Sequence, residues 1–251
     1  MTKRLTLLAA ACLFSANAFA ADGFTGFYIG AHAGHGKGDS DNTVTLGGAW
    51  ASESAALQAE VADRFSQSLN PSGSTFGLQL GYDHQFASGF LLGGEFDYSQ
   101  LNIEDTDSTG PQPTAPFPTL TYDFTNRIEA NDSLSLRLKA GYTNGSHLVF
   151  LTAGVGQVDV DASAGMVSNG GYNKLGTKSD SLDTTVWGVG YEYLFAENWS
   201  FRFDYLNTDA DDFRYDTVYQ PGSSFVTPAY TETVRQDFDY DTFRVGVNYR
   251  F

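Results

Sequence analysis

Polar and apolar residues alternate over several short stretches of this chain, and the last stretch is the clearest. From Asp241 to Phe251 the sequence reads DTFRVGVNYRF. The apolar residues stand at every second position: Phe243, Val245, Val247, Tyr249 and Phe251. Because successive side chains of a strand point to opposite faces, this alternation predicts a β-strand with one apolar and one polar face. A chain that ends on such a strand is typical of a closed membrane barrel, in which the last strand pairs with the first.

Seven earlier segments alternate in the same way. They are 27–34, 74–84, 90–100, 133–142, 147–156, 184–193 and 199–206. Most are close to the length of about 9–11 residues with which a tilted strand crosses a bilayer. Short and long connections alternate between them, and Asn144-Gly145 is a strong hairpin signal. We therefore predict an all-β fold, an eight-stranded antiparallel up-and-down transmembrane β-barrel with short turns on one side and long loops on the other.

The long connections are predicted to be four external loops, at about 35–73, 101–130, 157–183 and 207–239. In the first, Trp50, Leu57, Val61 and Phe65 recur near helical spacing. This spacing predicts a short amphipathic helix, with a disordered loop as the alternative. The second loop has four prolines between positions 111 and 118, which predict irregular structure there.

The polar parity of the strands is rich in charged residues, which would point into the lumen if the apolar parity faces lipid. The predicted lumen network consists of Gln79, Glu95, Asp97, Arg137, Lys139, Glu192, Arg202, Asp204 and Arg244, with Asp83 on the same face. A soluble lipocalin would have the reverse arrangement, apolar inside, so these charges favour a membrane barrel. The interior of an eight-stranded barrel is filled by its own side chains, and buried charges must pair. We predict a mutually neutralising plug, with a narrow gated ion path as the alternative.

The N-terminus predicts export. Residues 1–20 combine Lys3 and Arg4, an apolar segment from residue 5 to residue 14, and an Ala-Phe-Ala cleavage site. We predict a secretory signal peptide over 1–20, cleavage between Ala20 and Ala21, and a mature barrel over 21–251. The single cysteine, Cys12, would leave with the signal; its use as a lipoprotein anchor is the weaker interpretation.

Charge and hydropathy narrow the function further. The full chain has 14 basic and 30 acidic residues, and without Lys3 and Arg4 it has 12 and 30, a formal charge of −18. No basic stripe is present, so nucleic-acid binding is not expected. Mean hydropathy is −0.25, and no later apolar run approaches the about 18 residues of a membrane helix. The predicted location of the protein is therefore the bacterial outer membrane, with both termini in the periplasm.

Six motifs together resemble the small outer-membrane β-barrel family typified by the OmpA transmembrane domain, and the porin-family surface antigens. They are GFYIGAHAG at Gly26, LQLGYD at Leu78, RLKAGY at Arg137, GYEY at Gly190, FRFDYLNTD at Phe201 and VGVNYRF at Val245. The resemblance implies an inner gate of two glutamates, a lysine and an arginine. By motif, these positions correspond to Lys139, Glu192, Arg202 and Gln79, where Gln79 departs from the pattern and Glu95 or Asp97 could substitute.

The predicted function is a structural and surface-interaction role in the bacterial envelope, with the narrow gated ion channel as the alternative and a lipid-modifying enzyme as the weaker one. No catalytic, cofactor or metal site is predicted. The histidines, His32, His35, His84 and His147, form no motif with a serine, and haem or metal binding by His32 and His35 is disfavoured because they lie on opposite faces of a strand. The loops are acidic, which indicates a solvated surface; bridging of divalent cations to lipopolysaccharide phosphates and contact with a neighbouring cell are the sharper alternatives. The expected partners are outer-membrane lipid and lipopolysaccharide, extracellular ligands of the loops, and the barrel assembly machinery, which would read Tyr249 and Phe251 as a C-terminal insertion signal.

Overall fold

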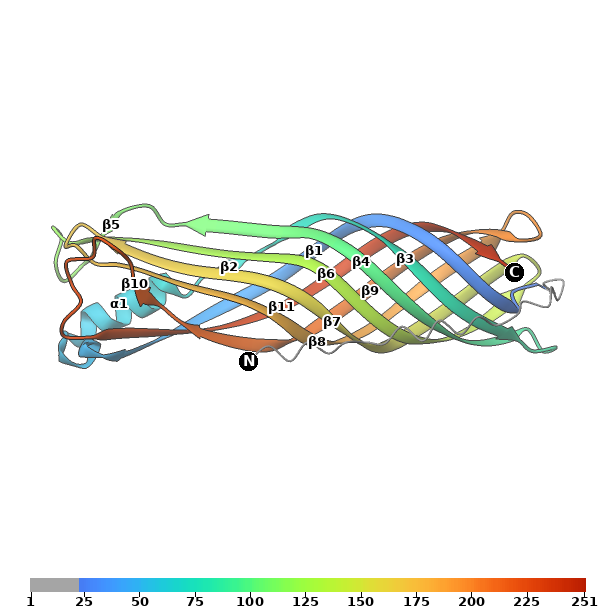
Figure 1. The fold of residues 1–251 in the computed structure, drawn as a ribbon, viewed down its shortest axis with the longest axis horizontal. Helices are drawn as coiled ribbons and strands as arrows, with labels where there is room; N and C mark the ends of the chain where they lie inside the picture. Colours follow the sequence, from blue (N-terminus) through green and yellow to red (C-terminus); the bar gives the residue numbers. More distant parts are fainter. Residues whose placement is uncertain (1–22) are drawn as a thin grey trace.

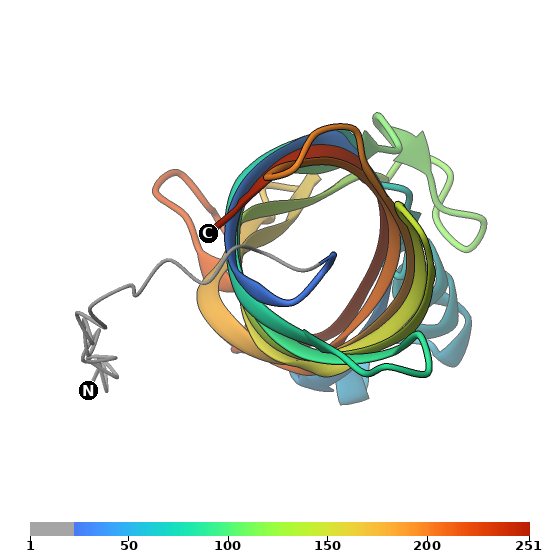
Figure 2. The same ribbon diagram turned by 90° about the vertical axis from the view of Figure 1, so that its right-hand side faces the viewer.

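Eight long antiparallel strands form a closed ring in a computed structural model, which describes residues 23–251. The predicted signal peptide and its cleavage site at Ala20 and Ala21 lie outside the described residues. Around the ring the order is β1-β3-β4-β6-β7-β8-β9-β11, and β11 pairs again with β1 (Figures 1 and 2). The ring confirms the predicted fold class. The strands are β1 (Gly26–Gly48), β3 (Ser72–Gln85), β4 (Phe90–Ser108), β6 (Thr121–Asn144), β7 (His147–Ser168), β8 (Asn173–Leu194), β9 (Trp199–Asp216) and β11 (Tyr230–Arg250).

Closure joins the two ends of the described chain. Tyr28 pairs with Arg250, and the backbone N–H of Phe251 donates to the carbonyl of Phe27 at 3.0 Å. Both ends therefore lie at the end of the barrel that carries the short turns after β3, β6 and β8. No helix among residues 23–251 has the length and apolar content to cross a membrane.

The strands continue far beyond the predicted boundaries, so the loop prediction is wrong in extent. Seven of them have 18–24 residues, and β3 has 14. At about 3.3 Å per residue, a 22-residue strand spans about 70 Å along its length, well beyond a bilayer core of about 30 Å even when tilted. Most of 35–48, 101–108, 121–130, 157–168, 173–183, 207–216 and 230–239 is strand. Irregular structure is confined to the tips, including the proline-rich segment, where only β5 (Gln112–Pro113) is regular.

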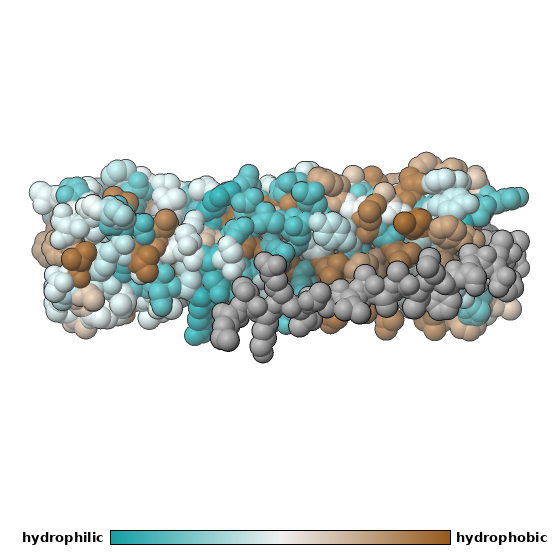
Figure 3. Space-filling view, in the orientation of Figure 1, coloured by the Kyte–Doolittle hydropathy of each residue, from teal (hydrophilic) through white to brown (hydrophobic). Residues whose placement is uncertain are grey.

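The interior changes character along the barrel. In the half that carries the short turns, called here the membrane half, the outward side chains are large and apolar and the inward ones charged; Leu138 is 75% exposed and Arg137 is 2% exposed. In the other half, called the projecting half, the inward side chains form a continuous apolar core that includes Phe124, Ile128 and Val160. Figure 3 shows the same change on the outer surface, brown toward the membrane half and mostly teal or white over the projecting half. The arrangement that argues against a lipocalin, with apolar side chains outside and charged ones inside, thus holds for the membrane half only.

This exchange of apolar and polar faces between the two halves explains why the predicted strands are shorter than the observed ones. Outside the bilayer an outward apolar parity is no longer needed, so the signal that identified the strands disappears although the strands continue. In β6 the register also shifts at Asn131–Asp132, against both β4 and β7. Inward positions are odd-numbered below the shift, as at Arg137, and even-numbered above it, as at Ile128. Because the inward positions change from odd to even within this one strand, strict alternation of polar and apolar residues does not identify it as continuous.

A helix completes the wall of the projecting half. β3 begins at Ser72, opposite Lys37 and Glu104, so no long strand separates β1 from β4 above that level. The helix α1 (Ala55–Phe65), which follows η1 (Ala49–Ser52), begins at Ser54, whose side chain accepts from the backbone N–H of Leu57. The predicted helix is confirmed at Leu57, Val61 and Phe65, which are buried in the apolar core, whereas Trp50 lies in η1.

The segment after α1 satisfies the open edge of β1. The backbone N–H of Asn42 donates to the carbonyl of Gln67, and that of Val44 donates to the Ser66 hydroxyl, both at 3.0 Å. The short strand β2 (Ser68–Leu69) then pairs with Ser40 and Asp41 of β1. Another two-residue strand, β10 (Val218–Tyr219), pairs with β8. The β1 edge is thus hydrogen-bonded rather than left as an unpaired template.

Candidate functional site in the barrel lumen

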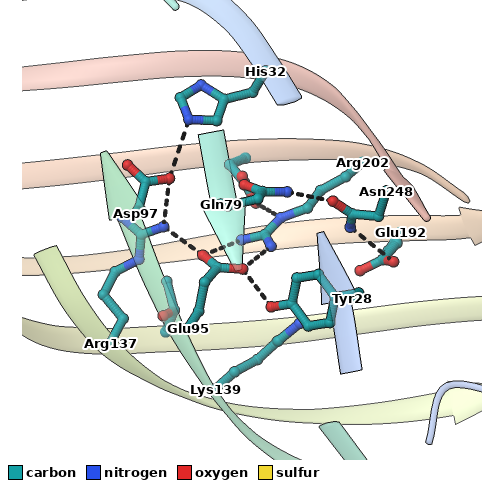
Figure 4. Close-up of polar contacts among 12 residues, drawn as sticks. Tyr28, His32, Gln79, Glu95, Asp97, Arg137, Lys139, Glu192, Arg202 and Asn248 are labelled. Carbon is teal, nitrogen blue, oxygen red and sulfur yellow. Dashed lines mark hydrogen bonds and ion pairs between the residues drawn. The ribbon is translucent and has the colours of Figure 1, made fainter. Parts of the chain in front are cut away.

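The membrane half encloses a network of charged side chains, with Glu95 at its centre (Figure 4). Glu95 accepts hydrogen bonds from the Tyr28 hydroxyl and from Arg137 Nη2, both at 2.5 Å. It also accepts both Nη groups of Arg202, which reaches across from β9. A carboxylate that is 2% exposed therefore has two arginines and a tyrosine as donors, which offsets the cost of burying its charge.

Asp97 and Asp204 extend the network toward β11. Asp97 accepts from Arg244 Nη1 at 2.9 Å and lies 3.1 Å from His32 Nε2. Asp204 accepts from Arg202 Nε at 2.9 Å and from Arg244 Nη2 at 3.1 Å. Arg244 thus joins two acids from different strands.

A second cluster lies nearer the short turns. Asp83 accepts from Lys139 Nζ and from Arg250 Nη2, each at 2.9 Å, and Arg250 Nη2 also donates to Glu192 at 2.8 Å. The Tyr28 ring links the two clusters, because Lys139 Nζ and the Arg250 guanidinium lie 4.5 and 4.8 Å from its centroid. Such cation–π contacts are strongest where water is excluded.

The lumen charges balance. Five acids, Asp83, Glu95, Asp97, Glu192 and Asp204, face five bases, Arg137, Lys139, Arg202, Arg244 and Arg250. All ten are at most 3% exposed. The ten residues come from six of the eight strands of the ring, so the network crosses the whole lumen rather than lining one wall. This is the arrangement predicted for a mutually neutralising plug.

Above and below the network the barrel is also filled. On the side of the projecting half a cavity of about 20 Å³ lies beside Asp97, Arg137 and Arg244, enough for about one water molecule. At the other end Phe24 is fully buried beside Leu91, Leu148 and Phe150, and its carbonyl accepts from Arg250 Nη1 at 2.7 Å. Side chains therefore fill the described lumen on both sides of the network.

The residues to which the OmpA-type gate was carried over all lie in the lumen, but they do not pair with one another. Lys139 pairs with Asp83, Glu192 with Arg250, and Arg202 with Glu95 and Asp204. Gln79 donates to Asn248 Oδ1 at 2.6 Å. Glu95 therefore takes the carboxylate place next to the arginine, as the sequence comparison allowed, while a switch of partners stays a prediction.

Some members of the network were outside the predicted set. Tyr28, His32, Asn248 and Arg250 all face the lumen. The alternation of the strands already gives these four residues the polar, inward face, but it does not show which acids and bases they contact. The predicted insertion signal lies on the same last strand as Asn248 and Arg250. Of that predicted signal, Tyr249 and Phe251 point outward, and Tyr249 packs against Trp199 with ring centroids 5.0 Å apart. Its reading by an assembly machinery stays a prediction.

A second buried ion pair, in the projecting half, was missed entirely. Glu232 is fully buried and accepts from Lys174 Nζ at 2.5 Å, from Trp50 Nε1 at 2.6 Å, and from the Tyr172 and Thr217 hydroxyls. Burial, and then the negative charge of Glu232, raise the pKa of Tyr172, so that its hydroxyl remains a donor. No sequence signal identified this site, because both charged residues fell in segments interpreted as loops.

Two of the histidines have identified partners. His32 is held between Asp97 and Arg244, and His147 Nδ1 lies 2.7 Å from the Tyr191 hydroxyl on the outer surface. Within residues 23–251, no three histidine or acidic side chains gather as metal ligands would.

Comparisons with known proteins agree with this architecture. The model of the outer membrane protein beta-barrel domain matches residues 6–251. Among solved structures, the chain is similar to Ail, the attachment invasion locus protein of Yersinia pestis (14% identity, 90% of this chain and 99% of that one, TM-score 0.37). It is also similar to the outer membrane protease OmpT of Escherichia coli (8%, 89% and 97%, 0.49) and to the outer membrane protein OprG of Pseudomonas aeruginosa (15%, 91% and 97%, 0.47). Among curated proteins, none matches the sequence. By its match over nearly the whole sequence, the chain belongs to the outer membrane protein beta-barrel family.

Proposed function

We propose that this protein is a non-conducting, non-enzymatic barrel of the bacterial outer membrane, whose function is carried by its projecting half. The observation that carries the proposal is the filling of the interior: a neutral ion-pair plug in the membrane half and an apolar core beyond it. A pore would need a continuous polar path, and the apolar core offers none. The gated channel is therefore the second candidate.

The proposal places the short turns and both termini in the periplasm and the projecting half outside the cell. Two features support this orientation. The short turns and long extensions follow the pattern of bacterial outer-membrane barrels. The outer face of the projecting half also carries many exposed acids, among them Asp159, Asp161 and Asp211, which suit an aqueous surface and the cation-rich lipopolysaccharide layer.

In this role the protein contacts outer-membrane lipid and lipopolysaccharide through its apolar belt, and extracellular ligands through the projecting half. The C-terminal strand, with Tyr249 and Phe251 outward, serves insertion by the barrel assembly machinery. The proposal includes no catalytic step, since His32 is locked in the lumen between charged partners and is 5% exposed.

Single-channel current in a planar bilayer tests the proposal. Purified protein, shown to be folded by heat-modifiable gel mobility, is expected to give no discrete current steps. Arg202→Ala removes a lumen cation from the plug, and Arg127→Ala, on the exposed outer face, is the matched control. Reproducible wild-type steps that change in Arg202→Ala but not in Arg127→Ala would overturn the proposal in favour of the gated pore.

A further inference from the structure

The tip of the projecting half contains an aromatic pocket that the barrel architecture does not require. Its volume is about 260 Å³, more than ten times that of the cavity above the plug. The pocket is lined mainly by Trp50, Leu57, Phe117, Tyr172, Phe225 and Tyr230. Its floor is buried, with Trp50 at 2% exposure, while Phe117 and Phe225 at the rim are exposed by 48% and 45%. The space is therefore open to a ligand from the tip.

Three of the rings pack edge to face against one another. The planes of Trp50 and Tyr230 meet at 80°, those of Tyr172 and Tyr230 at 90°, and those of Trp50 and Tyr172 at 62°. Their centroids are 5.0–6.1 Å apart. All three rings line the same corner of the pocket, and the negative face of an aromatic ring attracts a cation.

The polar groups of these three rings are already in use. Trp50 Nε1 and the Tyr172 hydroxyl donate to the buried Glu232, and the Tyr230 hydroxyl donates to Glu53 Oε1 at 2.5 Å. A ligand thus meets ring surfaces from them, rather than free donors, and a neutral polar ligand gains little there.

The remaining charge in the lining is that of Glu53. No basic side chain of the described residues forms an ion pair with it, whereas Glu232 behind the pocket is neutralised by Lys174 and Glu60 on α1 by Arg64. Tyr230 holds Glu53 at the pocket, and the partly buried carboxylate gives the pocket a net negative charge. An aromatic corner beside an unpaired carboxylate is the chemistry that recognises alkylated ammonium groups.

We propose that this pocket binds a small organic cation, with a quaternary or alkylated ammonium group among Trp50, Tyr172 and Tyr230 and its apolar part against Leu57, Phe117 and Phe225. The site deepens the proposed function, because it supplies the extracellular ligand of the projecting half. The two proposals fail separately: ion conductance would overturn the plug without affecting this pocket, and absence of binding would overturn the pocket without opening the lumen.

Fluorescence of Trp50 can report binding directly. The chain has three tryptophans, and Trp187 and Trp199 are exposed on the apolar belt, so a Trp187→Phe/Trp199→Phe background leaves Trp50 as the reporter. The probes are choline and 3,3-dimethylbutan-1-ol, which have nearly the same shape but differ in charge, and benzyltrimethylammonium, which adds an apolar arm. Full-length mature protein is used, in amphipol.

We expect saturable quenching by choline and tighter binding of benzyltrimethylammonium, with the neutral alcohol at least about tenfold weaker than choline. Glu53→Gln keeps the shape of the side chain and should weaken the binding of both cations about tenfold. Asp63→Asn removes the same charge from an exposed position of α1 outside the pocket lining and should leave it unchanged. Equal affinity for choline and its neutral analogue, an unaltered Glu53→Gln variant, or no saturation with any probe would each overturn the proposal.

A last arm identifies the source of the ammonium group. Vesicles of phosphatidylcholine carry it as a headgroup, and vesicles of phosphatidylglycerol do not. Displacement of bound benzyltrimethylammonium by the first but not the second would assign the pocket to a membrane-borne headgroup. Binding of free choline without displacement by either kind of vesicle would assign it to a soluble cation.

Discussion

Lys174 Nζ lies 2.5 Å from Glu232 Oε2 in the middle of the apolar core of the projecting half, and both side chains are at most 2% exposed. The pair ties β8 to β11 at the end of the barrel farthest from the membrane, next to the aromatic pocket. It is the counterpart, outside the bilayer, of the ion pairs in the lumen.

Removing one member of this pair should destabilise the projecting half strongly. Lys174→Met leaves Glu232 buried without a cation, and breaking a buried pair in this way costs about 3–5 kcal/mol. The exposed pair Lys178–Asp180, 3.0 Å apart on the same strand, provides the control, and Lys178→Met should cost less than about 1 kcal/mol. Urea unfolding followed by Trp50 fluorescence measures both. Equal shifts of the two variants would mean that Glu232 is stabilised by its other donors alone.

The extent of the strands predicts resistance to trypsin. All 12 basic residues after Arg4 lie in strands or in α1, and the projecting half carries Lys37, Arg64, Arg127, Lys174, Lys178, Arg214 and Arg235. We therefore expect trypsin added to intact cells to leave the protein uncut, since a hydrogen-bonded strand must open before a protease can bind it. Chymotrypsin should cleave after Phe225, which is exposed in an irregular segment, whereas Pro118 blocks cleavage after the similarly exposed Phe117.

The same experiment tests the orientation. Cleavage by chymotrypsin after Phe225 in intact cells places the projecting half outside, whereas cleavage only after the outer membrane is permeabilised would place it in the periplasm. Rapid tryptic cleavage at Lys178 or Arg214 would instead show that these segments behave as the loops that the sequence pattern indicated.

The membrane half could be predicted from the sequence because the bilayer imposes one rule on all eight strands. Residues such as Leu138 and Arg137 alternate as lipid and lumen require, and the pairing of Tyr28 with Arg250 follows from ring closure. The projecting half obeys another rule, apolar inside and polar outside, and the change of parity at Asn131–Asp132 coincides with the change of rule. A search for one pattern therefore ends each strand at the membrane surface.

Partners within the site were less predictable than positions. Parity placed Glu95, Lys139 and Arg202 in the lumen, but the choice of Asp83 rather than Glu192 for Lys139 depends on the stagger between β3 and β6, which no local pattern encodes. The aromatic pocket could not be predicted from the sequence for the same reason, because Trp50, Tyr172 and Tyr230 come from three segments that only the fold brings together.

Two glycines with nearly the same positive φ should respond differently to the same substitution. Gly145 in the β6–β7 turn has φ +60° with no atom within 4 Å of an added Cβ, and Gly48 at the end of β1 has φ +61° with the Ala229 carbonyl 2.5 Å from it. Gly145→Ala should cost about 1–2 kcal/mol, the strain of a left-handed alanine. Gly48→Ala should cost more, because the ψ of −129° at Gly48 lies outside the left-handed region that alanine can adopt and because the backbone at Ala229 must also move. Comparable urea midpoints for the two variants would show that this backbone yields freely.

Alkaline titration should reveal the contact between Tyr230 and Glu53. The hydrogen bond to the carboxylate, together with burial, raises the pKa of Tyr230 to about 12 from an ordinary value near 10. Because the folded-state pKa is the higher one, the contact stabilises the fold fully below about pH 10, and the contribution is lost as the pH rises through about 12. Absorbance at 295 nm, as the difference between wild type and Tyr230→Phe, should therefore show a late midpoint. In a Glu53→Gln background the same difference should titrate closer to pH 10, since the amide can accept the hydrogen bond but carries no charge. A midpoint that stays put when the carboxylate is removed would assign the shift to burial alone, and would remove Tyr230 as the group that holds Glu53 at the pocket.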